Sequence, residues 1–517
     1  LTARGQKLEY FRHPFLHLGA TPEDKQGLAT FLAAQGYTVA PVSFDTADYA
    51  WAARYVEPDN RDRAAAGYVP YWRLDRAAIA AFHGGRGRGS RSVASFDEDT
   101  TTLAVEAGRL ALAASPHPPS TLWFATAAPT YLEKTNATVV HAALRLDPST
   151  LAVDAGGAVR SGIAALRNAL HSADPATLVV TSDIRGGLAN SPDESAGGDA
   201  GAAIVAGSGD AETLVAEYLG GASATREFLD RWRAPGDVRT KQWEERFGET
   251  QLVALGQKAW AAALANVGLD AASVDAVLVA GPHGRAVNSF LKKLGRPNAV
   301  TLGDTVGNTG TAEAALLLAA YLETAAPGQT VALIGLCDGA DVLVFRTTEG
   351  VEARRPQRRI VDQIEAGNAS LPYAKFLSWR GVMPINPPNR PEPARSSASA
   401  AGRSIDWKFG FVGSVDRSTG AVHMPPARVS FVGGAVDEMD PLPMAEATGT
   451  IVTFTVDRLA YSPSPPVIFA VVDFDGGGRL PVEVCDVTAE DITVGGRVEM
   501  TFRRLNTADG IANYFWK

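Results

Sequence analysis

Residues 153–166 run VDAGGAVRSGIAAL, which predicts a short apolar strand, a glycine-rich turn and an alanine-rich helix. Similar strands and helices alternate on both sides of this stretch, from about residue 66 to residue 350. The predicted strands are short and apolar, and they span 121–126, 151–154, 177–183, 202–206, 276–280, 330–335 and 341–346. Helical stretches span 99–115, 252–267 and 311–324. This alternation predicts an α/β fold with a mostly parallel sheet covered by helices.

Further motifs follow one another in order along the same region. They are DEDT at 97–100, TSD at 181–183 before a Gly/Ala-rich strand, WRAPG at 232–236, GNTG at 307–310 and GLCDGA at 335–340. Together with 153–166 they resemble the thiolase superfamily, and hydroxymethylglutaryl-CoA synthases in particular. The resemblance implies a duplicated five-layer thiolase fold over residues 66–350, although no internal repeat is visible as sequence identity. A fold alone does not establish an activity.

The resemblance also locates the positions that carry the chemistry of these synthases. The acyl-accepting cysteine corresponds to Val159, which has no lone pair to attack a thioester and no proton to lose. The glutamate base corresponds to Ala127, and the catalytic histidine corresponds to Ala280. A local shift could instead bring in His283, which lies three positions later. Asn308 corresponds to the active-site asparagine and is retained.

Losing these groups leaves three hypotheses for the function. The first is an accessory or non-catalytic subunit of an acyl-CoA or acyl-transfer complex that forms C–C bonds, beside a catalytic thiolase or ketosynthase-like protein. The second is an enzyme that works without cysteine, as an acyl-CoA aldolase or an atypical acyltransferase. Aldol cleavage needs only a base, an acid and a held thioester carbonyl. The third is a purely structural homodimer whose pocket is filled by side chains.

Candidate pocket residues follow from the second hypothesis. Tyr131, His283 and Asp338 could supply the acid and the base, and Gly339 belongs to the glycine-rich loop that closes the site. Cys337 in the same loop is a weaker candidate for a relocated nucleophile. We expect a CoA thioester as a ligand, no tightly bound cofactor, and a homodimer formed through the thiolase fold.

The remainder of the chain has a different pattern. Residues 351–405 are polar and rich in proline, which predicts a linker. From 406 to 517 the pattern is all-β, with short strands at 449–456, 467–474, 497–503 and 514–516. A small β-barrel is the simplest fold that accounts for these short strands. Residues 407–434 resemble the zinc ribbon that precedes an OB-fold in small proteins that accompany thiolases, which implies a docking and channelling domain.

The zinc ligands of that ribbon are missing from this chain. The four cysteine positions hold Asp416, Thr419, Ser430 and Gly433. A structural zinc site needs four ligands, usually thiolate or imidazole, and one carboxylate cannot replace them. We therefore expect no zinc, and we expect the ribbon to be held by packing of Trp407, Phe411 and Phe431.

Composition argues against several other classes of protein. A net charge of −9 and an acidic C-terminal region argue against nucleic-acid binding. No apolar run is long enough to span a membrane, no signal-peptide pattern stands at the start, and two cysteines in 517 residues suit the cytoplasm. Residues 1–60 resemble part of a polysaccharide deacetylase barrel without its metal-binding motifs, which predicts a docking segment or a fusion remnant.

Overall fold

The computed structural model describes residues 65–517, apart from 114, 116–117, 173, 210–212, 297–299 and 355–357, together with residues 10, 11, 34, 38 and 39. The chain divides into two compact units, residues 1–55 and 56–517. In the first unit, strands β1 (Tyr10–Phe11) and β2 (Thr38–Val39) pair in parallel. The predicted deacetylase-like segment, 1–60, otherwise lies outside the described residues.

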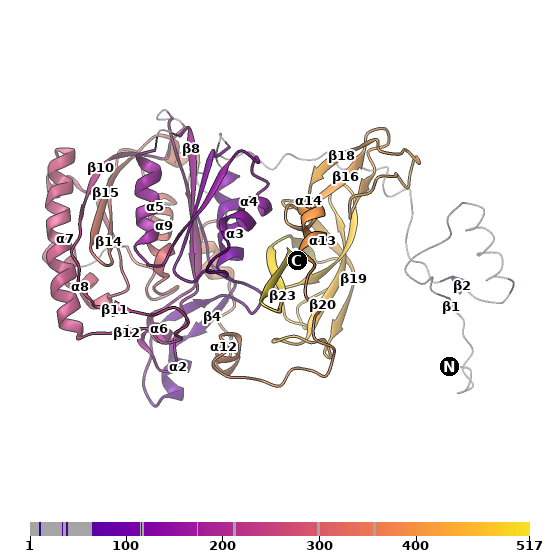
Figure 1. Cartoon of the computed structure of the whole chain (residues 1–517), viewed down its shortest axis with the longest axis horizontal. Helices are drawn as coiled ribbons and strands as arrows, with labels where there is room; N and C mark the ends of the chain where they lie inside the picture. Colours follow the sequence, from indigo (N-terminus) through magenta and orange to yellow (C-terminus); the bar gives the residue numbers. More distant parts are fainter. Residues whose placement is uncertain are drawn as a thin grey trace. The chain divides into compact units, whose positions relative to one another are not determined.

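The first of two mixed sheets lies within residues 65–207 (Figure 1). Its strands, in spatial order, are β3 (Ala65–Tyr68), β9 (Ala200–Gly207), β8 (Ala176–Asp183), β6 (Thr121–Thr126) and β7 (Leu151–Gly156). Strand β6 is parallel to β7 and β8, whereas β9 is antiparallel to β8 and β3. Every residue of β8 is buried, as expected for a strand with helices on both faces.

The second sheet repeats most of this topology. Its strands, in spatial order, are β10 (Ala216–Ala224), β15 (Ala340–Thr347), β14 (Thr330–Leu336) and β13 (Ala276–Ala280). Strands β13 and β14 are parallel, and β15 is antiparallel to both β14 and β10. These strands therefore follow the pattern of β6, β8, β9 and β3. The duplication that sequence identity does not reveal is present in the topology.

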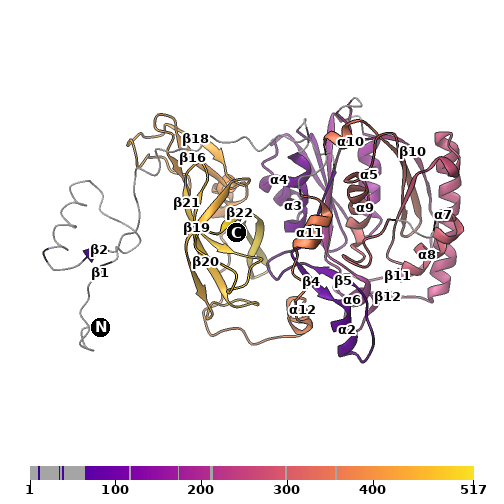
Figure 2. The same cartoon turned by 180° about the vertical axis from the view of Figure 1, so that it is seen from behind.

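Helices between the sheets and outside both of them complete five layers (Figure 2). The outer pairs are α3 (Thr100–Leu112) with α4 (Ala137–Ala143) and α7 (Glu245–Val267) with α8 (Gly284–Lys293), and the inner pair is α5 (Ser161–Leu170) with α9 (Glu313–Leu322). Ile163 of α5 packs with Leu316 of α9 and Leu333 of β14 in the central core. Burial of each such side chain contributes about 1.5–3 kcal/mol. The predicted duplicated α/β fold is confirmed. The expectation of a mostly parallel sheet is wrong, because β9 and β15 are each antiparallel to both of their neighbours.

Short elements surround these layers. They are the hairpins β4 (Trp72–Asp75) with β5 (Ser90–Val93) and β11 (Arg231–Trp232) with β12 (Lys241–Gln242), the helices α2 (Arg76–Phe82) and α6 (Pro192–Ala196), and the 3-10 turns η4 (Ala271–Ser273) and η5 (Gly310–Ala312). No helix in the described part of the chain is long and apolar enough to cross a membrane.

The segment predicted to be a linker, 351–405, contains packed helices. Its helices, with the two that flank it, are α10 (Gly350–Ala353), α11 (Ile360–Ala366), α12 (Tyr373–Trp379), α13 (Ala398–Arg403) and α14 (Ile405–Lys408). The Gln363 amide of α11 bonds the backbone of β3 and its neighbour: Oε1 accepts from Val69 N at 2.9 Å and Nε2 donates to Gly67 O at 2.9 Å. Phe376 and Leu377 of α12 are buried against the β4–β5 hairpin. The first half of the segment is therefore part of the five-layer domain.

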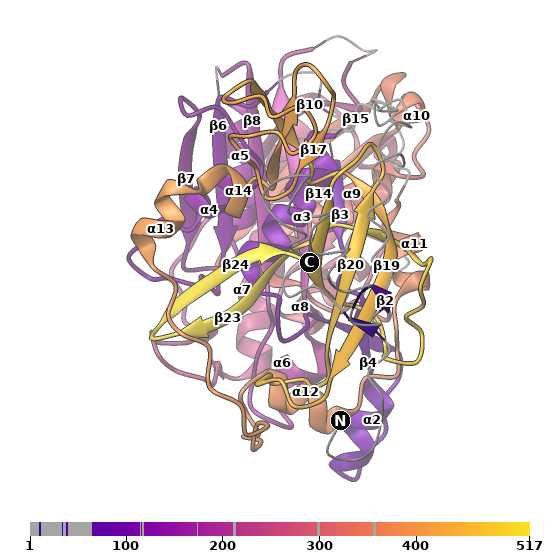
Figure 3. The ribbon, with the colours of Figure 1, turned by 90° about the vertical axis from the view of Figure 1, so that its right-hand side faces the viewer.

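From residue 412 onward the chain is all-β (Figure 3). One sheet contains β16 (Val412–Asp416), β17 (Val422–His423) and β18 (Met439–Pro443), a second contains β19 (Thr448–Asp457), β20 (Val467–Phe474), β21 (Arg479–Val484) and β22 (Arg497–Glu499), and β23 (Phe502–Ala508) pairs with β24 (Ile511–Trp516). Alternate residues of β20, from Ile468 to Phe474, are buried, so one face of this strand lies on the core. The small all-β domain predicted at the C-terminus is present.

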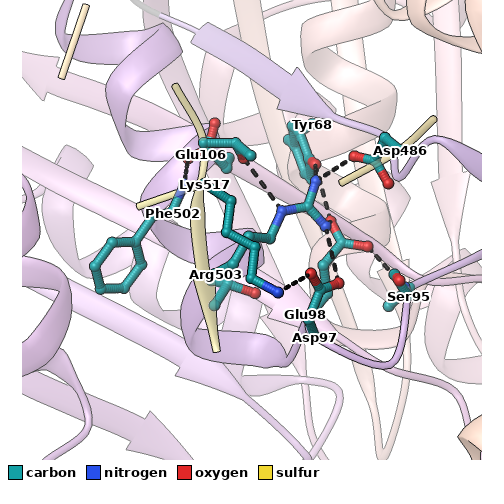
Figure 4. A network of polar contacts seen from close by, with 12 residues as sticks. Tyr68, Ser95, Asp97, Glu98, Glu106, Asp486, Phe502, Arg503 and Lys517 are labelled. Carbon is teal, nitrogen blue, oxygen red and sulfur yellow. Dashed lines mark hydrogen bonds and ion pairs between the residues drawn. The ribbon is translucent and has the colours of Figure 1, made fainter. Parts of the chain in front are cut away.

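A buried network of charged side chains joins this domain to the five-layer domain (Figure 4). Arg503 Nη1 lies 2.8 Å from Glu98 Oε1, and Arg503 Nη2 donates to Asp486 Oδ2 at 2.5 Å. Lys517 Nζ donates to Asp97 Oδ2 at 2.9 Å. Glu98 and Asp97 precede α3, whereas Arg503 and Lys517 belong to the C-terminal domain. The network therefore fixes the position of that domain against the start of α3.

Within this network, the pKa values of Asp97 and Glu98 shift in opposite directions. Although burial opposes it, the nearby cations Lys517 and Arg503 lower the pKa of Asp97 to about 2. Burial raises the pKa of Glu98 to about 7, even though Arg503 opposes the rise. Buried ion pairs of this kind are costly to break, because one charge is then left without a partner.

Candidate functional site

A cavity of about 930 Å³ opens in the five-layer domain at the carboxyl ends of β6 and β14. It is lined by the turn before α5, the loop from Phe228 to Thr240, and the loop after β14. The lining includes Ala127, Val159, Arg185, Trp232, Cys337 and Asp338. Two of the three replaced family positions, Ala127 and Val159, therefore share one cavity.

Val159 lies in the turn between β7 and α5, close to the first residue of that helix. Gly157 in the turn has a positive φ of 97°, which glycine adopts without strain. A Cβ added to Gly162 would lie only 2.1 Å from Thr311 O, so the start of α5 packs directly on η5. The half-buried Val159 side chain thus lies at a helix N-terminus, where a thiolate would be stabilised but where a valine cannot react.

The wall at Ala127 is fixed by Asp183, the buried last residue of β8. Asp183 Oδ1 accepts from Ala127 N at 2.8 Å and from Thr126 Oγ1 at 3.0 Å. Asp183 Oδ2 accepts from Thr311 N at 2.8 Å and from Thr311 Oγ1 at 2.6 Å. Both oxygens of this carboxylate are therefore used to hold the Ala127 wall against η5.

Asn308, the retained family residue, is bonded to a carboxyl group that the sequence analysis did not single out. Asn308 Nδ2 donates to Glu313 Oε2 at 2.6 Å and to Gly281 O at 2.8 Å, and its Oδ1 accepts from Gly310 N at 3.1 Å. Gly281 N also donates to Glu313 Oε2, at 2.9 Å. Burial raises the pKa of Glu313 to about 8, against the opposing effects of Gly281 N, Arg185 and Asn308.

The two candidates for the histidine position lie in different surroundings. Ala280 is buried at the end of β13, next to Gly281. His283 caps helix α8: its Nδ1 accepts from Ala286 N at 3.1 Å, and its Nε2 lies 3.0 Å from Glu245 O. Because Nδ1 must be the acceptor, Nε2 is the donor, and both ring nitrogens are used. His283 is not among the residues that line the cavity.

Tyr131, Asp338 and Gly339 lie at or beside the cavity. Tyr131 lines it, and its hydroxyl accepts from Ala512 N of β24 at 3.0 Å, so the C-terminal domain supports this wall. Asp338, which also lines it, has a positive φ of 49°. Partial desolvation raises the pKa of this carboxyl. Gly339 has a φ of 136°, and a Cβ there would lie 2.6 Å from Arg160 Nη1.

Among the described residues that line the cavity, Cys337 is the one that contains sulfur. Its side chain is buried, and this burial raises the pKa of the thiol far above the range in which a thiolate forms at neutral pH. The Asp338 carboxyl adds to the rise, whereas Arg185 and Arg160 oppose it. Since the thiolate is the nucleophilic form, Cys337 is suited to an inert role.

Arg185 brings a positive charge into the cavity. Its guanidinium lies 3.8 Å from Asp183 Oδ2 and 3.8 Å from Asp193 Oδ1, too far for hydrogen bonds. Its backbone is fixed by the buried Arg91, which donates to Arg185 O at 3.0 Å. Arg185 was not predicted from the sequence, since an arginine two residues after TSD has no distinctive spacing.

The four residues that stand at the zinc-ligand positions of the ribbon lie close together, but they do not provide four metal ligands. Asp416 Oδ1 accepts from Ser418 N at 2.8 Å, and a Cβ on Gly433 would lie 3.2 Å from Thr419 Cγ2. Hydrogen bonds from Ser430 and Ser418 lower the pKa of Asp416. Within the described residues no group of three or more His, Cys, Asp or Glu side chains could hold a metal ion.

All three aromatic residues predicted to hold the ribbon make ring contacts, although Phe431 is largely exposed. Trp407 stacks on the buried Phe411 at a ring separation of 5.4 Å, and Phe411 also contacts Trp516. Phe431 is 59% exposed and meets the His423 ring at 4.3 Å. The ribbon is therefore held by hydrogen bonds to Asp416 and by packing around Phe411.

Known proteins resemble the two parts of the chain separately. Over 340 residues the chain is 28% identical to the hydroxymethylglutaryl-CoA synthase of Methanopyrus kandleri, covering 60% of this chain and 95% of that protein. The synthase of Aeropyrum pernix is 26% identical over 340 residues, covering 62% and 93%. Residues 443–503 match the family model described as the C-terminal OB-fold domain of ChsH2.

Solved structures agree on the fold. An HMG-CoA synthase complexed with CoA has a TM-score of 0.52 at 17% identity, covering 61% of this chain and 89% of that chain. MvaS in complex with 3-hydroxy-3-methylglutaryl coenzyme A has a TM-score of 0.53 at 20% identity, covering 65% and 94%. The chain is a hydroxymethylglutaryl-CoA-synthase-like protein of the thiolase fold joined to an OB-fold domain.

Proposed function

We propose that this protein binds an acyl-CoA thioester in the cavity and acts on it without forming an acyl-enzyme. The observation that carries the proposal is Val159 at the wall of an open cavity, in the turn where the related synthases are expected to place their nucleophile. The buried Cys337 thiol does not replace it, because burial raises its pKa. The chemistry left is proton transfer and charge stabilisation on a bound thioester.

Size and charge at the cavity support a CoA thioester as the ligand. A volume of about 930 Å³ is near the upper end of ordinary ligand pockets, and suits a long pantetheine arm with its acyl group. Arg231, Trp232 and Arg233 line one side, where guanidinium groups can bind phosphates and the indole can stack on a base. Two of the structural neighbours were solved with CoA or its hydroxymethylglutaryl thioester.

The reaction class that fits these groups is aldol-type C–C bond chemistry on acyl-CoA. Aldol cleavage proceeds through an enolate and requires no covalent acyl carrier. The test is to incubate the purified chain with a 3-hydroxyacyl-CoA and to follow products by chromatography and mass spectrometry. We expect a shorter acyl-CoA and a carbonyl compound in equal amounts. A covalently acylated polypeptide, found by intact mass, would rule the proposal out.

An accessory role is the second candidate, and the combined replacement of three family positions by Val159, Ala127 and Ala280 favours it. A catalytic thiolase or ketosynthase-like partner would then supply the nucleophile, with the OB-fold domain as the docking element. Binding of acyl-CoA without turnover by the chain alone, and turnover only after a ketosynthase is added, would favour this role. In either case we expect the protein to act in the cytoplasm.

Self-association through the first sheet is the expected quaternary arrangement. Strand β7 is its edge strand and pairs only with β6 in the described structure, and Leu151 on it is 59% exposed. An unpaired edge with an exposed apolar side chain is suited to pairing with a second copy. Analytical ultracentrifugation of the full chain, with Leu151→Lys as the disruptive variant, tests this arrangement.

A further inference from the structure

We propose that Arg185 and Glu313 form the reacting end of the cavity, where Arg185 binds the thioester oxygen and Glu313 exchanges a proton with the carbon next to the carbonyl. This inference rests on the proposed function, since it assumes that an acyl-CoA enters the cavity. It goes further because it assigns the chemistry to two residues outside the positions where the family resemblance places catalytic groups. It also names the substrate class: thioesters with an enolisable α-carbon.

Arg185 is suited to bind an oxyanion because its nearest carboxylates are used elsewhere. Asp183 accepts four hydrogen bonds from Thr126, Ala127 and Thr311, and Asp193 is paired with Arg231. The Arg185 side chain is only 11% exposed and lines the cavity. A mostly buried guanidinium whose nearest carboxylates lie at 3.8 Å retains donors for a negatively charged oxygen.

Glu313 is placed to exchange a proton at the same end of the cavity. Both donors that reach it, Gly281 N and Asn308 Nδ2, bond to Oε2, and no described group donates to Oε1. Glu313 stays partly exposed whereas the six residues after it in α9 are buried. Its surroundings include Arg185 and Pro282, which follows Gly281, and both of these line the cavity. Glu313 is not itself among the lining residues, so a substrate would have to reach it past Arg185 and Pro282, which are.

The proposed step is a reversible proton transfer that needs no other reactant. The ionised Glu313 carboxylate takes a proton from the α-carbon, and the C–H electron pair forms the carbon–carbon double bond of an enolate. The carbonyl electron pair moves onto oxygen, where Arg185 balances the new charge. Return of the proton restores the thioester. If the carboxyl has meanwhile exchanged with D₂O, a deuteron is returned instead.

The experiment measures deuterium uptake into acetyl-CoA in D₂O by mass spectrometry, with the rate without protein subtracted. We expect Glu313→Gln to lower the exchange rate by about 100-fold or more, as for loss of a general base. Arg185→Met is expected to lower it by about 100-fold, as for loss of an oxyanion donor. Glu349→Gln and Arg346→Met are matched surface controls that should exchange like the wild type, since both residues are exposed.

Binding of acetyl-CoA, followed by calorimetry, separates this inference from the proposed function. Binding by the wild type without exchange would overturn the inference and leave the proposed ligand intact. Absence of binding would overturn both. A wild-type pH profile gives a test that needs no variant: the exchange rate should rise through an apparent pKa near 8, the value to which burial raises Glu313. A flat profile would contradict the assignment.

Discussion

Arg503 of β23 and Glu98 before α3 form a buried ion pair of 2.8 Å across the boundary between the OB-fold domain and the five-layer domain. Both side chains are 1% exposed. We expect Arg503→Met to lower the free energy of unfolding by about 3–5 kcal/mol, because Glu98 and Asp486 are left without their cation. Urea denaturation, followed by tryptophan fluorescence, measures the change.

A matched control exists for that substitution at the surface. Arg358 lies 2.6 Å from Glu499, but the two side chains are 50% and 65% exposed. Arg358→Met should therefore cost about 1 kcal/mol or less. Equal losses from the two variants would show that the buried network does not hold the domains together.

Stability should depend on pH through Glu313. Burial raises the pKa of this carboxyl from its ordinary 4.5 to about 8, so the folded protein binds the proton more tightly than the unfolded chain. The stability from this group is present below pH 4.5 and is lost as pH rises toward 8. Relative to the wild type, Glu313→Gln should become more stable with rising pH in this window, by at most about 1.4 kcal/mol per pH unit. A constant difference across denaturation curves from pH 5 to 9 would contradict this.

A cysteine introduced at the position of Val159 should be reactive. The side chain lies at the start of α5 and at the cavity, where the helix dipole favours a thiolate and reagents have access. We expect Val159→Cys to react with iodoacetamide at least about ten-fold faster than either native thiol, as measured by peptide mass spectrometry. Wild-type Cys337, which is buried, serves as the internal reference. Faster labelling of Cys337 would refute the assignment of the two positions.

Substituting cysteines at the four former ligand positions should restore zinc binding to the ribbon. A Cβ added to Gly433 would lie 3.2 Å from Thr419 Cγ2 and 3.5 Å from Asp416 Oδ2, so these positions are close in space. We expect the quadruple variant Asp416→Cys, Thr419→Cys, Ser430→Cys, Gly433→Cys to bind one zinc ion per chain by elemental analysis. The wild type should bind none, and chelators should not change its melting temperature. Zinc in the purified wild type would show that another ligand set exists.

Much of the fold follows from local patterns in the sequence. Strands β6 and β13 begin and end at the predicted residues, as does β20 in the C-terminal domain. Strand β10 was not predicted, because two adjacent glycines and a bulge near Gly220 remove its apolar alternation. Helix α11 was also not predicted, since its buried face is set by contacts with distant strands rather than by a long periodic pattern.

Residues of the candidate site could be predicted only where they belong to a recognisable sequence motif. Ala127 and Val159 line the cavity, and their match to the catalytic positions of the family stays a prediction, whereas His283 serves as a helix cap. Glu313 and Arg185 could not be inferred, because their meeting depends on loops from different halves of the duplicated fold. One signal was available for Glu313: it is the only charged residue within the apolar helix α9.

The hydrogen bond from Ala512 to Tyr131 places a strand of the OB-fold domain directly behind one wall of the cavity. Because both parts belong to one polypeptide, their association is intramolecular and does not weaken on dilution. Ligands that alter the wall at Tyr131 can thus influence the OB-fold domain at a fixed one-to-one stoichiometry, whatever the expression level of the protein.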